Sequence, residues 1–131
     1  VAASMSGYTT IRLLEKYPVS HLVLMVPAVY HKAAFELPFG NGFSELIRRP
    51  RSWLETDAWG LISKFTGKLM IIYAEHDEVV PKEIIERLCE AKQGSKLYMV
   101  EGSHHRILSY LQDKPAKFSH MAEAIHTFLQ T

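Results

Sequence analysis

The sequence contains a single cysteine, Cys89, so no disulfide bond can form within its 131 residues. A chain without disulfide bonds favours a reducing compartment, and we therefore expect a cytoplasmic protein. Cys89 itself falls among apolar neighbours in a predicted helix, where a buried packing role is more common than a reactive one.

Long apolar runs are also absent, because none approaches the roughly 18–20 residues of a membrane-spanning helix. The formal net charge is only +1, which argues against nucleic acid or an anionic membrane as a partner. The phosphate-binding patterns G-x-G-x-x-G and G-x-x-x-x-G-K-[ST] are missing, which disfavours a nucleotide-binding domain, and we expect no cofactor. No initiator methionine is present and the chain opens inside a motif, which predicts that it is a fragment.

The remaining composition, 47% hydrophobic and 22% charged, is that of an ordinary globular protein and suits one domain over residues 1–131. Continuous apolar runs predict buried strands near 21–26, 68–73 and 95–100, and residues 1–3 look like the end of another strand. Helical patterns are expected near 5–17, after Pro81, at 107–111 and at 116–130. Strands that alternate with helices predict an α/β fold of three αβα layers around a mostly parallel sheet.

A long irregular stretch at about 28–65 is rich in aromatic residues, with short helices expected at 43–48 and 56–64. One interpretation is a cap-like insertion that lines an apolar pocket. The other is a surface helical excursion packed on the edge of the sheet. The sequence alone does not separate them.

Ser4 occupies a position typical of a nucleophile, between the end of a strand and the start of a helix. Such a serine sits on a tight turn whose flanking positions need small side chains, usually in the pattern G-x-S-x-G. Ala2 and Ser6 hold those positions here, with Gly7 behind them. A turn centred on Ser6 would put Tyr8 at a flanking position, where it should clash. The alternative for Ser4 is a helix N-cap.

Asp77 lies in a loop after a predicted strand and is the candidate acid. Its alternative role is to cap the helix that follows, while Glu75 and Glu78 could be solvated loop acids. Asp57 and Glu55 are less favoured acids in the aromatic stretch. A histidine has a pKa near neutrality and can take the proton of a serine hydroxyl, and a carboxylate can orient that histidine.

The sequence resembles the C-terminal half of α/β-hydrolase fold proteins, beginning at the nucleophile elbow. The resemblance rests on Ser4, on the Asp77 loop with its Val-Val-Pro helix start, and on a final loop with a histidine three residues after Gly102. That spacing selects His105 over His104. The resemblance implies a catalytic triad of Ser4 as nucleophile, Asp77 as orienting acid and His105 as general base.

The same resemblance implies that the backbone N–H of Met5 contributes to an oxyanion hole. The second donor would come from a loop before Val1, so we expect the segment alone to be weakly active or inactive, and to associate through exposed strand edges. Paired with His104, His105 could suggest a metal site, but no Cys, Asp or Glu stands at ligand spacing, and no metal is expected.

The predicted function is hydrolysis of a carboxylic ester, thioester or amide through an acyl-enzyme, with a small-molecule acyl substrate. The alternative is a catalytically silent binding module of the same fold, which the departure from two glycines at Ala2 and Ser6 favours. An aspartate nucleophile is disfavoured because the elbow position holds Ser4. A homo-oligomer is compatible with either function.

Overall fold

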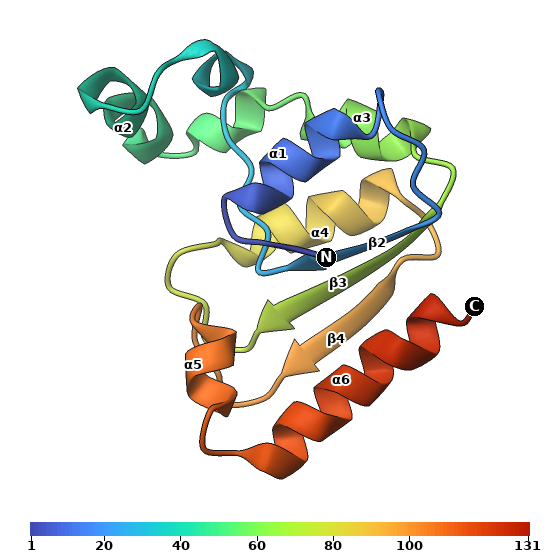
Figure 1. Ribbon diagram of the computed structural model, residues 1–131. Helices are drawn as coiled ribbons and strands as arrows, with labels where there is room; N and C mark the ends of the chain where they lie inside the picture. Colours follow the sequence, from blue (N-terminus) through green and yellow to red (C-terminus); the bar gives the residue numbers. More distant parts are fainter.

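The computed structural model describes residues 1–131 and is built on one parallel sheet (Figure 1). Its strands are β1 (Ala2–Ala3), β2 (His21–Met25), β3 (Lys68–Ala74) and β4 (Lys96–Val100), in the spatial order β1-β2-β3-β4. Every neighbouring pair is parallel, with Ala3 beside Met25, Met25 beside Ile72 and Ile72 beside Tyr98. The predicted α/β fold with a parallel sheet is confirmed.

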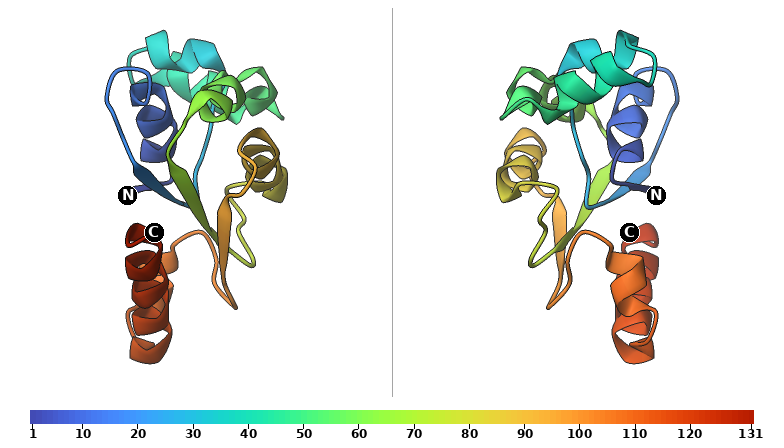
Figure 2. Two further views of the ribbon diagram at one scale, coloured as in Figure 1. Left: turned by 90° about the vertical axis from the view of Figure 1, so that its right-hand side faces the viewer. Right: turned by 90° about the vertical axis from the view of Figure 1, so that its left-hand side faces the viewer.

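Helices cover both faces of this sheet (Figure 2). One face carries α1, α3 and α4, and the other carries α5 and α6. The α-helices are α1 (Ser6–Leu13), α2 (Asn41–Arg48), α3 (Ala58–Lys64), α4 (Lys82–Ala91), α5 (Ile107–Leu111) and α6 (Pro115–Leu129). None of them combines the length and the apolar character that a membrane span needs.

Alternate residues of the central strands point into two separate cores. Leu24 and Ile71 face the core under α1, α3 and α4. Met25 and Ile72 face the core shared with α5 and α6. Because successive side chains of a strand point to opposite faces, burial on both sides explains why these strands are continuous apolar runs.

Two helices differ from the sequence prediction. Helix α1 ends at Leu13 rather than near Tyr17, which is 60% exposed. Pro18 disfavours the helical conformation of the residue before it, so the helix stops early. Helical spacing predicts that Phe118, Met121, Phe128 and Leu129 share one apolar stripe of α6. Met121 and Phe128 are buried, whereas Phe118 and Leu129 are about half exposed.

The aromatic stretch at 28–65 contains, besides α2 and α3, two short 3₁₀ helices, η1 (Lys32–Glu36) and η2 (Ser52–Glu55). Its second half belongs to the core, because Trp53 and Ile62 are buried with residues of α1 and α4. Its first half lines a cavity described below. The second half is thus not a surface excursion on the edge of the sheet, because it packs in the core on one face of the sheet.

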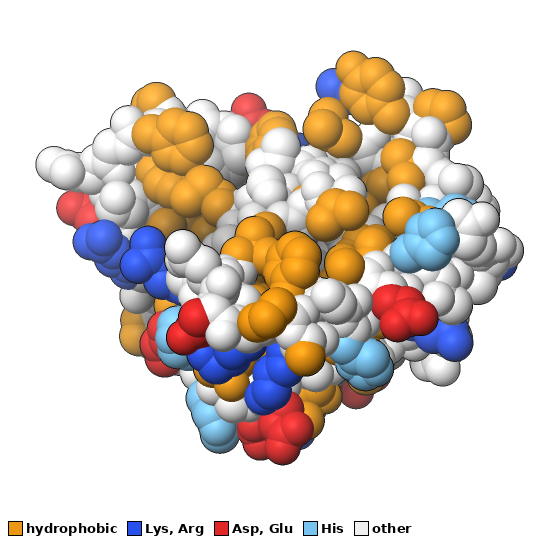
Figure 3. All heavy atoms as spheres, turned by 60° about the horizontal axis from the view of Figure 1, so that its bottom comes forward, with side chains coloured by type: hydrophobic (Ala, Val, Ile, Leu, Met, Phe, Trp, Pro, Cys, Tyr) orange, Lys and Arg blue, Asp and Glu red, His pale blue; other side chains and the backbone are white.

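Seen from the side of α6, the surface carries apolar side chains in several separate patches (Figure 3). Phe118 of α6 and Leu108 of α5 are among the exposed large apolar residues. The sheet also ends in two unpaired edges, at β1 and at β4.

Candidate active site

The strands β1, β3 and β4 finish at the same end of the sheet, and the residues that follow them bring Ser4, Asp77 and His105 into contact. The Ser4 hydroxyl oxygen lies 2.9 Å from His105 Nε2. His105 Nδ1 lies 3.0 Å from Asp77 Oδ2 and 3.1 Å from Oδ1. Loops at the carboxyl ends of parallel strands meet at one edge, which explains how residues so distant in sequence converge.

The direction of these hydrogen bonds follows from the acid. An ionised carboxylate can only accept, so Nδ1 of His105 bears the proton that Asp77 accepts. In a neutral imidazole Nε2 is then the acceptor, and the Ser4 hydroxyl donates to it. The side chains of His105 and Asp77 are 14% and 9% exposed, so water competes little for this pair.

Ser4 sits on a strained turn. Its φ angle is +50°, in the left-handed region that residues other than glycine seldom adopt. Three backbone hydrogen bonds hold it there: its N–H donates to the Met25 carbonyl, and its own carbonyl accepts from Gly7 and Ala28, each at 3.0 Å. Such strain costs about 1–3 kcal/mol and persists only where the surroundings fix it.

Ser6 has a structural role in this turn that the sequence did not reveal. Its hydroxyl accepts a hydrogen bond from the Ala3 N–H at 2.9 Å and donates one to the Ala3 carbonyl at 2.7 Å. Gly7 is needed for a different reason, because a Cβ there would approach Pro27 Cβ to 3.1 Å. Helix α1 thus crosses close to the chain that leaves β2.

Asp77 contacts His105 and also holds the turn before α4, but it does not cap that helix, because the N-cap residue is Pro81. Its Oδ1 accepts hydrogen bonds from the backbone N–H groups of Val79 and Val80, both at 2.8 Å. The same carboxylate faces His105. The turn that leads into α4 therefore also fixes the orientation of the acid.

Glu75 and Glu78 are more than solvated loop acids. Glu75 Oε2 accepts from the Gly102 N–H at 2.7 Å, and Glu78 Oε2 accepts from the His105 N–H at 3.3 Å. Hydrogen bonds from its own backbone N–H and from that of His105 lower the pKa of Glu78. The His76 N–H also donates to the Ser103 carbonyl. These hydrogen bonds join the loop after β3, which carries Asp77, to the loop after β4, which carries His105.

The two less favoured acids lie away from His105 and have other partners. Asp57 accepts from the Tyr8 hydroxyl at 2.6 Å and pairs with Arg12 at 2.5 Å. Burial, and then the bond to Asp57, raise the pKa of Tyr8. Glu55 pairs with His31 Nε2 at 2.5 Å.

Met5 follows Ser4 at the start of α1, and its backbone N–H makes no hydrogen bond within the chain. His104 packs against Tyr110, with 6.1 Å between the ring centroids. No group of three or more His, Cys, Asp or Glu side chains is arranged to hold a metal ion.

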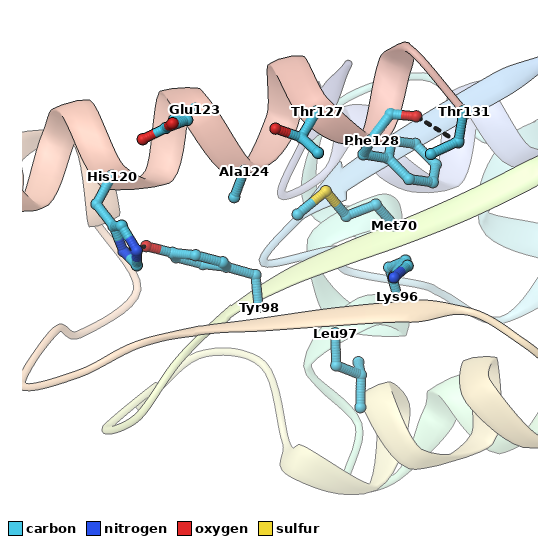
Figure 4. Close-up of a pocket in the computed structure, with 10 residues that line it drawn as sticks. All are labelled: Met70, Lys96, Leu97, Tyr98, His120, Glu123, Ala124, Thr127, Phe128 and Thr131. Atoms are coloured by element: carbon cyan, nitrogen blue, oxygen red, sulfur yellow. Dashed lines mark hydrogen bonds between the residues drawn. The ribbon is translucent and has the colours of Figure 1, made fainter.

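Two cavities differ in their relation to these residues. One of about 280 Å³ includes Met5 in its lining and is almost entirely apolar. A larger one of about 450 Å³ lies between β4 and α6, where Tyr98 and His120 meet at 2.9 Å (Figure 4). None of the residues Ser4, Asp77 and His105 lines the larger cavity, so it is not part of this site.

No protein-family model matches the sequence, and no curated protein sequence matches it. Solved structures do match. A CIB-like hydrolase from Thermoplasma acidophilum is 24% identical over 92% of this chain, with a TM-score of 0.61. An α/β hydrolase from a lagoon-sediment metagenome is 15% identical over the whole chain, with a TM-score of 0.69. The meta-cleavage product hydrolase of Pseudomonas fluorescens is 17% identical over 86% of the chain, with a TM-score of 0.59.

The chain spans only part of these proteins: 45%, 63% and 60% of their respective lengths. At these identities the likeness concerns the fold. The parallel strand order and the helices on both faces of the sheet agree with the three structural matches. The chain has the α/β-hydrolase fold.

Proposed function

We propose that the protein is a serine hydrolase that cleaves a carboxylic ester, thioester or amide through an acyl-enzyme. The observation that carries the proposal is the unbroken contact from Ser4 Oγ to His105 Nε2 and from His105 Nδ1 to Asp77. A serine hydroxyl needs an adjacent base to become a nucleophile at neutral pH, and the base needs a group that orients it.

In the first step Ser4 Oγ attacks the carbonyl carbon of the substrate while its proton passes to His105 Nε2. The bond from that carbon to the leaving oxygen, sulfur or nitrogen then breaks, and His105 returns the proton to the leaving atom. Water next attacks the acyl carbon, giving a proton to His105, and the bond to Ser4 Oγ breaks as the proton returns to Ser4. Asp77 stabilises the imidazolium in both halves of the cycle.

The backbone N–H of Met5 is the proposed donor to the developing oxyanion. It follows the nucleophile directly, at the N-terminal end of α1, and no acceptor within the chain competes for it. One such donor typically contributes about 10²–10³ in rate.

The class of reaction also has support from the solved neighbours, which are described as hydrolases. Because the chain covers less than two thirds of each of them, the activity of the complete protein is part of the proposal. The alternative, a silent binding module, has support from Ala2 and Ser6 at the flanking positions of the turn and from an apolar cavity that could bind a ligand without Ser4.

Turnover by the complete protein tests the proposal. We expect hydrolysis of activated esters to be lost in Ser4→Ala, with the rate reduced by at least about 10³-fold, while Ser6→Ala keeps measurable turnover. Rapid mixing should reveal an acyl intermediate on Ser4. Undiminished hydrolysis by the folded Ser4→Ala variant would rule the mechanism out, and a folded protein that turns over no ester, thioester or amide would favour the silent module.

A further inference from the structure

The cavity beside Ser4 has a wall of aromatic rings. It lies between α1 and the segment at 30–43, and Met5 places it next to the nucleophile. Tyr8 meets the rings of Tyr30 and Phe35 edge to face, with centroids 6.1 and 6.2 Å apart, and Tyr30 meets Phe43 at 6.0 Å. Edge-to-face contacts of this kind are favourable and hold the rings of this wall against one another.

Its polar groups are few and neutral. No charged side chain is part of the lining. The Tyr8 hydroxyl is engaged with Asp57, which leaves only the hydroxyls of Thr9 and Tyr30. The Arg12 guanidinium stacks 4.2 Å from the centre of the Phe35 ring but pairs with Asp57. A charged group placed against this lining would lose part of its hydration and find no counter-charge, which favours a neutral ligand.

The volume limits the size of a ligand. A dry apolar cavity of roughly 150 Å³ takes up benzene, so about 280 Å³ offers room for roughly ten carbon atoms. We propose that this cavity binds a neutral apolar group of that size, aromatic or aliphatic, that is attached to the scissile bond. The inference rests on the proposed function, since it identifies the substrate class of the same site.

Two ester series measured with the complete protein test this inference, because the apolar group could belong to the acid or to the alcohol. The acyl series compares 4-nitrophenyl acetate with 4-nitrophenyl 4-phenylbutanoate. The alcohol series compares ethyl acetate with 4-phenylbutyl acetate. We expect kcat/KM to be at least about tenfold higher for the larger ester in one of the series, since each buried methylene contributes about 0.8 kcal/mol.

A variant that fills the cavity separates binding from general reactivity. Thr9 is an exposed residue of α1 at the cavity, so Thr9→Trp adds bulk there without disturbing the core. Thr127→Trp is the matched control, because Thr127 is an exposed threonine of α6. We expect Thr9→Trp to remove the preference for the larger ester and Thr127→Trp to keep it. Equal kcat/KM in both series would overturn the inference and leave the proposed function standing.

A binding measurement without turnover distinguishes failure of the cavity proposal from failure of the hydrolase proposal. The Ser4→Ala variant is titrated with neutral 4-phenylbutanamide and with charged 4-phenylbutylammonium by calorimetry. We expect the amide to bind at least tenfold more tightly than the ammonium, and Thr9→Trp to weaken the amide at least tenfold. If the amide binds in this way but the wild-type protein hydrolyses no ester, thioester or amide, the cavity binds a neutral apolar group and the proposed hydrolase function is wrong. Equal affinity for the two compounds would overturn the cavity.

Discussion

Ser4 is held near His105 by a backbone that the residue would not adopt on its own. Its positive φ is maintained by bonds to Met25, Gly7 and Ala28, which belong to the end of β2, the first turn of α1 and the chain after β2. Ser6 closes the same turn through its hydroxyl. A serine at a flanking position where glycine is usual is therefore compatible with the turn, because its small side chain fits there and makes two hydrogen bonds with Ala3.

Asp77→Asn separates the two roles of the acid. The amide oxygen of asparagine can still accept from Val79 and Val80, so we expect a Tm within a few degrees of the wild-type protein. An amide cannot stabilise the imidazolium of His105 and favours the wrong tautomer, so kcat should fall by about 10³–10⁴-fold. Esterase assays paired with thermal denaturation check this; a large loss of Tm with proportionate loss of activity would show that Asp77 serves the turn alone.

The three residues in contact at the site could be predicted from the sequence because each follows a predicted strand and belongs to a short motif of restricted residue types. Glu75 and Ser6 could not be predicted in their roles. Their partners are backbone groups of Gly102 and Ala3, and a backbone group leaves no mark in the sequence. Only the path of the folded loops brings these atoms together.

At the scale of elements, the loop after β3 and the loop after β4 act as a pair. Glu75 accepts from Gly102, and the His76 N–H donates to Ser103, so the histidine loop is anchored before it reaches His105. Gly102 has a φ of +75°, and a Cβ there would meet the Tyr110 hydroxyl at 2.6 Å. Glycine adopts this left-handed conformation at no steric cost, and any larger residue would also displace the Tyr110 hydroxyl.

Loss of the Glu75 acceptor should misplace His105. We expect Glu75→Ala to lower kcat about tenfold or more with little change in KM. The Gly102 N–H would lose its acceptor and the loop that carries His105 would loosen. A displacement of a catalytic group by about 1 Å can lower the rate about 10²-fold. Glu75→Gln keeps a neutral acceptor and should restore most of the rate. Equal losses in both variants would mean that the charge, not the loop geometry, matters.

Ion pairs connect the aromatic stretch at 28–65 to α4. Arg51 donates to both carboxylate oxygens of Glu83 at 2.8 and 3.0 Å, and Arg87 reaches the same carboxylate at 3.1 Å. Arg51 also lies 5.1 Å from the centre of a Trp53 ring. Arg51 thus links this stretch to α4.

This contact should weaken in acid. Hydrogen bonding to Arg51, and then to Arg87, lowers the pKa of Glu83 below its ordinary value of 4.5. An acid whose pKa is depressed by folding stabilises the folded state above its ordinary value and loses that effect as the pH falls through the lowered pKa. We expect amide hydrogen exchange at 48–55, corrected for its intrinsic pH dependence, to accelerate as the pH falls below 4.5, the ordinary value for the pKa of a glutamate. Glu83→Gln should be fast already at pH 7; a pH profile identical to wild type would contradict this role.

Helix boundaries were the weakest element-scale predictions. The spacing of Tyr8, Ile11, Leu14 and Tyr17 predicts a longer α1, but periodicity cannot say which apolar residues find a partner. Tyr8 and Ile11 are buried under α3, while Tyr17 is exposed. The 3₁₀ helices were missed because a segment of four or five residues has no measurable period.

At the scale of the whole molecule, the parallel sheet could be predicted because strands buried on both faces are continuous apolar runs separated by helices. In this arrangement β4 pairs with β3 on one side only. On the β4 edge, Leu97 and Met99 are 52% and 45% exposed, next to unpaired backbone groups. An exposed apolar edge strand is a template for pairing with another chain.

We therefore expect self-association that increases with concentration and depends on this edge. Leu97→Lys places a charge on the β4 edge and should shift sedimentation profiles toward the monomer, whereas Leu108→Lys, on the exposed surface of α5, should not. The same degree of association in both variants would locate the contact elsewhere on the molecule.

The central claim is that Ser4 is an activated nucleophile, and covalent labelling tests it most directly. The complete, folded protein is treated with a fluorophosphonate probe, and the adduct is located by mass spectrometry of its peptides. The account predicts one adduct, on Ser4, that is absent in Ser4→Ala and forms at least about 10²-fold more slowly in His105→Ala. A folded protein without any adduct, or labelling that persists unchanged in Ser4→Ala, would contradict it.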